Sequence, residues 1–210
     1  MRRCAHLLVA AIALIPASAS AQLGTGRSGT STERTIIGGR EVFDDLNAFG
    51  RCFAAQQTND ALRLVRPEAG SADEARVYKS LFSKEQSCLG DLAGLTVPWQ
   101  YVRGAVAEGF YTRAVPLPPE LAFPRDLPPE KVKSVMDAAT CYAGRHAATA
   151  RDLIGKTKPA SKEESAAFDA LWTDFQDCLP SNMPRDFKFD TLLLRYRIAE
   201  ALWRQGAARQ

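Results

Sequence analysis

The chain carries the same two-cysteine unit twice, and this internal repeat constrains its fold more than any other feature. Cys52-Phe53-Ala54 recurs as Cys141-Tyr142-Ala143. A second cysteine follows each motif at nearly the same distance, Cys88 in the first copy and Cys178 in the second. The register between the copies drifts by only a few residues, which predicts a duplication with small loop insertions.

The two copies also end alike. Arg103-x-x-Val-Ala-Glu108 recurs as Arg195-x-x-Ile-Ala-Glu200, and apolar or aromatic residues follow each glutamate. A segment with apolar residues on two sides is typical of a helix in the middle of a protein. These two segments are therefore predicted to be the central helices of the molecule.

The N-terminal residues have the pattern of a secretory signal. Arg2 and Arg3 precede an apolar run over residues 7–15, which ends before Ala19-Ser20-Ala21. This predicts a signal peptide over residues 1–21, a mature start at Gln22 and export to the periplasm or the extracellular space. No other segment approaches the roughly 20 apolar residues of a membrane helix, so the mature chain is not expected to span a membrane.

Removal of the signal leaves an even number of cysteines, which in an exported chain indicates disulfides. If each copy carries its own bridge, Cys52 pairs with Cys88 and Cys141 pairs with Cys178. A four-cysteine zinc site needs closely spaced ligand pairs, which this chain lacks, so no metal and no cofactor are expected.

The expected fold class is all-α, with two tandem four-helix units related by a pseudo-twofold axis and one disulfide per unit. A Gly/Ser/Thr-rich arm (residues 22–39) should precede the first unit (40–112), and a Pro-rich surface strap (113–129) should join it to the second (130–206). The dense prolines of the strap favour extended polyproline geometry and disfavour helix and sheet.

Start signals place the helices within each unit. The first helix is expected over residues 41–57 in one copy and 129–146 in the other, followed by a short second helix. Ser71 with Glu74, and Ser161 with Glu164, form capping boxes that start the third helix. The fourth helix should start near Pro98 in one copy and after Asp190 in the other.

The charge of the chain argues against nucleic acid as a partner. The net charge of +3 falls to +1 when Arg2 and Arg3 leave with the signal. The remaining basic residues form no block of the kind that follows a phosphate backbone.

Glu108 and Glu200 are the first candidates for chemistry, because both copies keep a carboxylate on an otherwise apolar segment. If the central helices met across a twofold axis, the two carboxylates could form an acid/base pair or bind a cation. The structural interpretation, which we favour, is that each glutamate forms a structural ion pair or caps the end of a neighbouring helix. Arg103 and Arg195 point away from the glutamate of their own helix, which leaves Arg51, Arg145 or an arginine of the other unit as partners.

Other candidates are weaker. His146 falls on the apolar stripe of its helix, where a histidine is more often structural than catalytic. No serine or free cysteine has the setting of an activated nucleophile. The large aromatic side chains are expected mainly in the core, although an exposed subset would make a binding groove. The side chains considered are those of Trp99, Trp172, Trp203 and Tyr111.

The signal peptide, the two Cys-aromatic-Ala helices, the Ser-x-x-Glu starts and the Arg-x-x-(Val/Ile)-Ala-Glu endings together resemble small secreted bacterial all-helical proteins with a duplicated two-cysteine unit. The resemblance covers about residues 41–205. It implies a fold but no activity.

Three functions are compatible with these patterns. The leading hypothesis is a non-enzymatic exported helical module of the cell envelope, which is structural or binds a protein, a peptide or another envelope component. The second is a hydrolytic enzyme that uses Glu108 and Glu200 in a shared cleft. The third is a carrier of a small apolar ligand, which requires an enclosed cavity lined by Trp and Phe between the units. The sequence does not specify the oligomeric state.

Overall fold

A computed structural model describes residues 40–82, 87–89, 97–180 and 189–206, and all regular structure in these ranges is helical. This confirms the predicted all-α class. The predicted signal peptide (residues 1–21) and arm (22–39) lie outside the described residues. No helix in the described ranges has the length and hydropathy needed to cross a bilayer.

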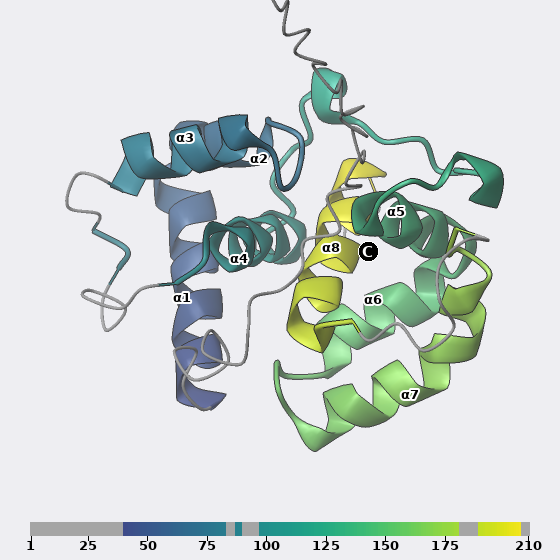
Figure 1. Ribbon diagram of the computed structural model, residues 1–210. Helices are drawn as coiled ribbons and strands as arrows, with labels where there is room; N and C mark the ends of the chain where they lie inside the picture. The colour runs from purple at the N-terminus through teal and green to yellow at the C-terminus, as the bar shows by residue number, and fades with distance from the viewer. Residues whose placement is uncertain (1–39, 83–86, 90–96, 181–188, 207–210) are drawn as a thin grey trace, which may run out of the picture.

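Two central helices separate the remaining helices into two groups. Figure 1 shows α4 and α8 in the middle, with α1 to α3 on one side and α5 to α7 on the other. We call residues 40–112 the first half and residues 130–206 the second half. The helices are α1 (Arg40–Gln56), α2 (Thr58–Val65), α3 (Ala72–Phe82), α4 (Trp99–Thr112), α5 (Val135–Arg145), α6 (Ala147–Lys156), α7 (Lys162–Gln176) and α8 (Thr191–Arg204).

The central helices start where their sequence signals place them. Pro98 precedes α4, and the side chain of Asp190 caps α8 by accepting a hydrogen bond from the Leu193 N–H at 3.0 Å. Every residue over 102–111 in α4 and over 194–204 in α8 is buried. A helix with apolar residues on two sides avoids water only if other helices cover both sides, which is the position that α4 and α8 take.

Glycines allow the central helices to approach their neighbours closely. A Cβ atom added to Gly50 of α1 would lie 2.1 Å from the carbonyl oxygen of Ala105 in α4, and one added to Gly109 would lie 2.4 Å from the Gly50 carbonyl oxygen. A Cβ atom on Gly104 would lie 2.3 Å from the Cβ of Tyr196 in α8. Any larger residue at these positions would force the helices apart.

The first helix of the second half is shorter than predicted. The expected helix over residues 129–146 begins instead at Val135, after a 3₁₀ turn over Pro129–Lys131. The reason is a capping box that the prediction missed. The Ser134 hydroxyl accepts from the Asp137 N–H at 3.1 Å, and the Asp137 carboxylate accepts from the Ser134 N–H at 3.0 Å, which fixes the helix start.

The caps of α3 and α7 follow the prediction in one bond and differ in the other. Ser71 and Ser161 each accept a hydrogen bond from the backbone N–H of the glutamate three residues on, at 3.1 and 3.0 Å. The carboxylates of Glu74 and Glu164 accept from the N–H one residue before the serine, at 2.5 and 2.6 Å, rather than from the serine N–H. One oxygen of each carboxylate therefore remains for another partner.

The predicted disulfides are confirmed. Cys52 bonds to Cys88 and Cys141 bonds to Cys178, with a Cα–Cα distance of 5.7 Å in both. Each bridge joins the first helix of its half to the segment that follows the third helix. Each bridge therefore lies within one half, and neither bridge joins the two halves.

The segment over residues 113–129 contains short helical turns that the proline content argued against. Pro119–Leu121 forms a 3₁₀ turn, and the backbone on either side of it is extended. The strap is held to α8, because the Phe123 N–H donates to the Arg204 carbonyl at 2.9 Å and the Arg204 guanidinium lies 4.4 Å from the Phe123 ring centroid. Leu121 is buried.

Candidate functional site

A buried arginine of α4 pairs with a glutamate of α8. The Arg103 Nε donates to Glu200 Oε2 at 3.0 Å, and its Nη2 donates to Glu200 Oε1 at 2.6 Å. Both side chains are fully buried, with exposures of 1% and 0%. Two parallel bonds of this kind match the fork of a guanidinium to a carboxylate and fix the relative position of the two helices.

The reverse pair joins the same two helices. The Arg195 Nε of α8 donates to Glu108 Oε2 of α4 at 2.9 Å, and its Nη2 donates to Glu108 Oε1 at 2.9 Å. The arginine of each half therefore holds the glutamate of the other half. Of the partners that the sequence left open, the arginine of the opposite unit is the one found, and Arg51 and Arg145 bind neither glutamate.

Each central arginine also caps the C-terminal end of a short helix. Arg103 donates to the carbonyls of Leu64 and Val65, at 3.4 and 2.8 Å, at the C-terminal end of α2. Arg195 donates to the carbonyls of Leu153 and Ile154, at 3.3 and 3.1 Å, at the C-terminal end of α6. The last carbonyls of a helix lack partners within it and carry partial negative charge, so a buried cation there is favourable.

The capping glutamates of α3 and α7 complete both clusters. Glu74 Oε1 lies 3.7 Å from Arg103 Nη1, and Glu164 Oε1 lies 3.2 Å from Arg195 Nη1. Burial raises the pKa of Glu74 and of Glu164 above the ordinary value, although the neighbouring arginines oppose this. The sequence showed both glutamates only as helix caps. Their recurrence in both copies was the available signal for a second role.

Two further arginines surround Glu200 but have no counterpart at Glu108. Arg197 Nη1 lies 3.3 Å from Glu200 Oε2, and Arg204 Nη2 lies 3.0 Å from Glu200 Oε1. Burial alone would raise the pKa of Glu200, but Arg103, Arg204 and Arg197 together lower it to about 2. Burial lowers the pKa of Arg197 and of Arg204.

Glu108 is held by one arginine and one amide. Its Oε1 accepts from the Asn47 side-chain amide at 3.3 Å, and the Asn47 oxygen accepts from the Tyr196 hydroxyl at 2.8 Å. Burial is the main cause that raises the pKa of Tyr196 well above its ordinary value, so this hydroxyl stays a donor. Glu108 therefore has fewer charged partners than Glu200.

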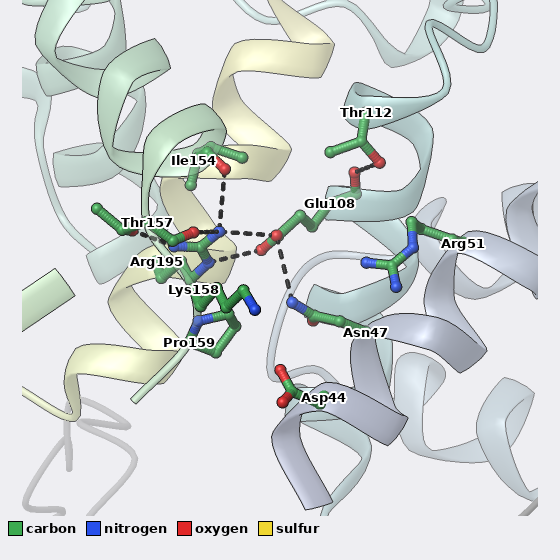
Figure 2. Close-up of a pocket in the computed structure, with 10 residues that line it drawn as sticks. All are labelled: Asp44, Asn47, Arg51, Glu108, Thr112, Ile154, Thr157, Lys158, Pro159 and Arg195. Atoms are coloured by element: carbon green, nitrogen blue, oxygen red, sulfur yellow. Dashed lines mark hydrogen bonds and ion pairs between the residues drawn. The ribbon is translucent and has the colours of Figure 1, made fainter. Parts of the chain in front are cut away.

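A cleft of about 390 Å³ opens beside Glu108, between the two halves (Figure 2). Residues of α1 and α4 form one wall, and residues of α8 and of the segment from α6 to α7 form the other. Its volume lies within the range of small-molecule sites. The lining residues are Asp44, Asn47, Arg51, Glu108, Thr112, Ile154, Thr157, Lys158, Pro159 and Arg195.

The rim of the cleft carries charged side chains that have no partner among the described residues. The side chains of Asp44, Arg51 and Lys158 make no hydrogen bond or ion pair with the described residues. Arg51 and Lys158 are exposed and point across the opening in Figure 2. A hollow with fixed polar groups in its floor and free charges at its rim is suited to a ligand that itself carries charge.

The remaining sequence candidates lie outside this cleft. His146 stacks on Tyr142, with a centroid separation of 5.0 Å, and its Nδ1 lies 3.5 Å from Asp174 Oδ2. The Trp203 indole donates to the Val115 carbonyl at 2.9 Å and stacks on Phe110.

Aromatic rings do not line the cleft either. A smaller cavity, of about 30 Å³, is lined by phenylalanines, a tyrosine and aliphatic side chains of the first half, and it contains no tryptophan. It has room for about one water molecule. Neither cavity is the Trp- and Phe-lined cavity between the units that an apolar carrier requires.

No group of three or more His, Cys, Asp or Glu side chains within the described ranges is arranged to hold a metal ion. Comparison of the chain with protein families, with curated protein sequences and with solved structures finds no match.

Proposed function

We propose that this protein is a non-enzymatic exported binding module, and that the cleft beside Glu108 is its binding site. The observation that carries the proposal is the set of unpaired charges around a preformed hollow. Asp44, Arg51 and Lys158 surround an opening whose floor is held rigidly by the ion pair between Glu108 and Arg195. A floor that is already ordered lowers the entropy cost of binding, which then falls mainly on the side chains of the rim.

The geometry weighs against hydrolysis by Glu108 and Glu200. Each carboxylate forms two bonds with a different arginine, so the two do not act as a pair. A general base must take up a proton near the working pH. Glu200, with its pKa of about 2 and no exposed surface, is a poor base.

The two halves are proposed to be copies of one ancestral unit, related by a pseudo-twofold axis. The exchange of ion pairs between Arg103–Glu200 and Arg195–Glu108 supports this proposal, because a twofold operation would convert one pair into the other. The carbonyls and capping glutamates around each arginine also correspond. The ion pairs then hold the halves together and keep both walls of the cleft in place.

Export is proposed from the N-terminal signal pattern, with the disulfides in support. Two disulfides, one within each half, are typical of a protein that matures in an oxidising compartment. A periplasmic or extracellular location follows, and the ligand is then proposed to be a protein, a peptide or another envelope component.

The proposal is tested by affinity capture from an envelope extract, followed by mass spectrometry. Wild type is compared with the double variant Arg51→Ala/Lys158→Ala, which removes the cationic rim. The control is Arg145→Ala/Lys79→Ala, which removes an equal charge at exposed positions of α5 and α3. A partner that is lost with the rim variant and kept with the control supports the proposal. Equal capture by all three proteins contradicts it.

A further inference from the structure

We infer that the cleft beside Glu108 binds a guanidinium group, in the position that the protein's own Arg204 takes against Glu200. The inference rests on the proposed binding function of this cleft and adds the chemical class of the ligand. It follows from a comparison of α4 with α8, because the two helices share one sequence pattern but differ at the residue that would fill the cleft.

The differing residue lies four positions after each glutamate. This position is Arg204 in α8 and Thr112 in α4. Arg204 sends its guanidinium onto Glu200, with Nη2 at 3.0 Å from Oε1. Thr112 is too short to reach Glu108 in this way, and its hydroxyl donates instead to the Glu108 backbone carbonyl at 2.9 Å. Thr112 lines the cleft, and Glu108 Oε1 accepts instead from the neutral Asn47 amide at 3.3 Å, a donor that an incoming guanidinium would replace.

The acceptors that Arg204 uses also have counterparts in the cleft. Besides Glu200, the Arg204 guanidinium donates to the Val65 carbonyl at the end of α2. The equivalent residue at the end of α6 is Ile154, which lines the cleft beside Glu108. A guanidinium in the cleft would thus meet a carboxylate and a helix-terminal carbonyl, as Arg204 does.

Charge favours a cation at the same place. In the cluster around Glu200, Arg103, Arg197 and Arg204 face two carboxylates. In the cluster around Glu108, Arg195 is the one arginine among the described residues that pairs with the two carboxylates, while Arg51 and Lys158 lie at the rim. The charges of the cluster around Glu108 are therefore compatible with one further buried cation. A planar guanidinium donates several hydrogen bonds at fixed angles, which suits a carboxylate and a carbonyl side by side.

The cations at the rim indicate a second feature of the ligand. Arg51 and Lys158 would repel a simple cation, but they are complementary to a carboxylate on the same molecule. Arginine as a free amino acid carries both groups. An arginine within a polypeptide carries the guanidinium and depends on its neighbours for the negative charge. The two sources share the guanidinium chemistry and are separated by experiment.

Binding is measured by NMR titration of the isotopically labelled full-length protein with L-arginine, N-acetylarginine amide and L-citrulline. Citrulline has the shape of arginine without the charge. We expect saturable shifts at Asn47, Thr112 and the Arg195 Nε–H with L-arginine, and none with citrulline. Saturation by N-acetylarginine amide as well assigns the site to arginine in a polypeptide, whereas saturation by L-arginine alone assigns it to the free amino acid. No saturable shift with either arginine compound, or equal shifts with citrulline, overturns the inference.

The location is tested by Thr112→Arg, which should place the protein's own guanidinium in the cleft. This variant should weaken arginine binding by about tenfold or more, which is the change in affinity expected from the loss of one charge-assisted hydrogen bond. Thr173→Arg on the exposed face of α7 adds the same charge elsewhere and should leave binding unchanged. Unchanged binding by a folded Thr112→Arg protein overturns the location. If arginine fails to bind but envelope capture still depends on Arg51 and Lys158, the guanidinium inference falls and the proposed binding function stands.

Discussion

Arg103 in α4 and Glu200 in α8 form a buried two-point ion pair, with N–O distances of 3.0 and 2.6 Å, between residues far apart in the sequence. The reverse pair, between Arg195 and Glu108, lies between the same helices. Removing one partner of such a pair leaves an uncompensated charge in the interior, which costs more than the pair itself contributes.

The two glutamates are predicted to differ in their effect on stability. Glu200→Gln leaves Arg103, Arg197 and Arg204 with Glu74 alone and should lower the free energy of unfolding by about 3–5 kcal/mol. Glu108→Gln leaves Arg195 with Glu164 and should cost less, about 1–3 kcal/mol. The equivalent positions of the two glutamates in the sequence would by themselves predict similar losses. Chemical denaturation of both variants measures the difference.

The control for this pair of variants is Glu120→Gln. It neutralises an exposed ion pair with Arg66 in which both side chains are more than half exposed, so it should change stability by no more than about 0.5 kcal/mol. If both core variants were as stable as this control, the ion-pair assignment would be wrong and catalysis by these carboxylates would have to be reconsidered.

Stability is predicted to fall in acid because of Glu200. Its pKa is about 2 in the folded state against an ordinary 4.5, so the unfolded chain takes up the proton first as the pH falls. Its contribution is therefore complete above pH 4.5 and is lost between 4.5 and about 2, amounting to about 3 kcal/mol. Urea denaturation at a series of pH values should show this fall in wild type and a flatter profile in Glu200→Gln.

Glu74 and Glu164 are predicted to act in the opposite direction. The pKa of each is raised by burial, so the folded protein takes up these protons before the unfolded chain does. Stability should therefore rise slightly as the pH falls from neutral toward 4.5, before the Glu200 effect reverses it. In the double variant Glu74→Gln/Glu164→Gln this rise should be missing, and its persistence there would show that other groups cause it.

The crossing of α1 and α4 is predicted to tolerate no side chain at Gly50. By helix propensity alone, Gly50→Ala should stabilise an exposed helix by about 1 kcal/mol. Here the new Cβ would lie 2.1 Å from the Ala105 carbonyl oxygen, and overpacking of this kind costs about 1–3 kcal/mol. The matched variant Ala48→Gly, at an exposed position of α1, reports the propensity term by itself. A stabilised Gly50→Ala protein would contradict the close approach.

Each disulfide is predicted to stabilise the protein by a similar amount. The bridges Cys52–Cys88 and Cys141–Cys178 close loops with sequence separations of 36 and 37 residues. In the chain-entropy description such a loop contributes about 4 kcal/mol. Replacing both cysteines of one bridge by serine should therefore give losses that agree between the halves, as measured by thermal unfolding under non-reducing conditions. A large difference between them would mean that native contacts, rather than loop closure, dominate.

Features that depend on short-range chemistry, or on motifs that recur along the chain, could be predicted without the structure. Ser71, Ser161 and Asp190 start helices where they were predicted to, because a cap bonds to backbone groups only a few residues away. The disulfide pairing was predicted correctly from the recurring cysteine motif, since each motif and the cysteine that follows it lie in the same half. The helix start at Val135 was missed, because the apolar period extends beyond the capping box at Ser134.

The candidate site could not be predicted, because it depends on how helices that are distant in the sequence pack against each other. A helical pattern shows that Glu108 and Glu200 lie on apolar segments, but it does not show which arginine reaches them, because that depends on how α4 and α8 cross. The second role of Glu74 and Glu164 was equally hidden, since one carboxylate oxygen caps a helix and the other faces an arginine distant in sequence. The difference between Thr112 and Arg204 is visible in the sequence. It acquires a meaning only when the cleft that the shorter side chain leaves open is seen beside Glu108.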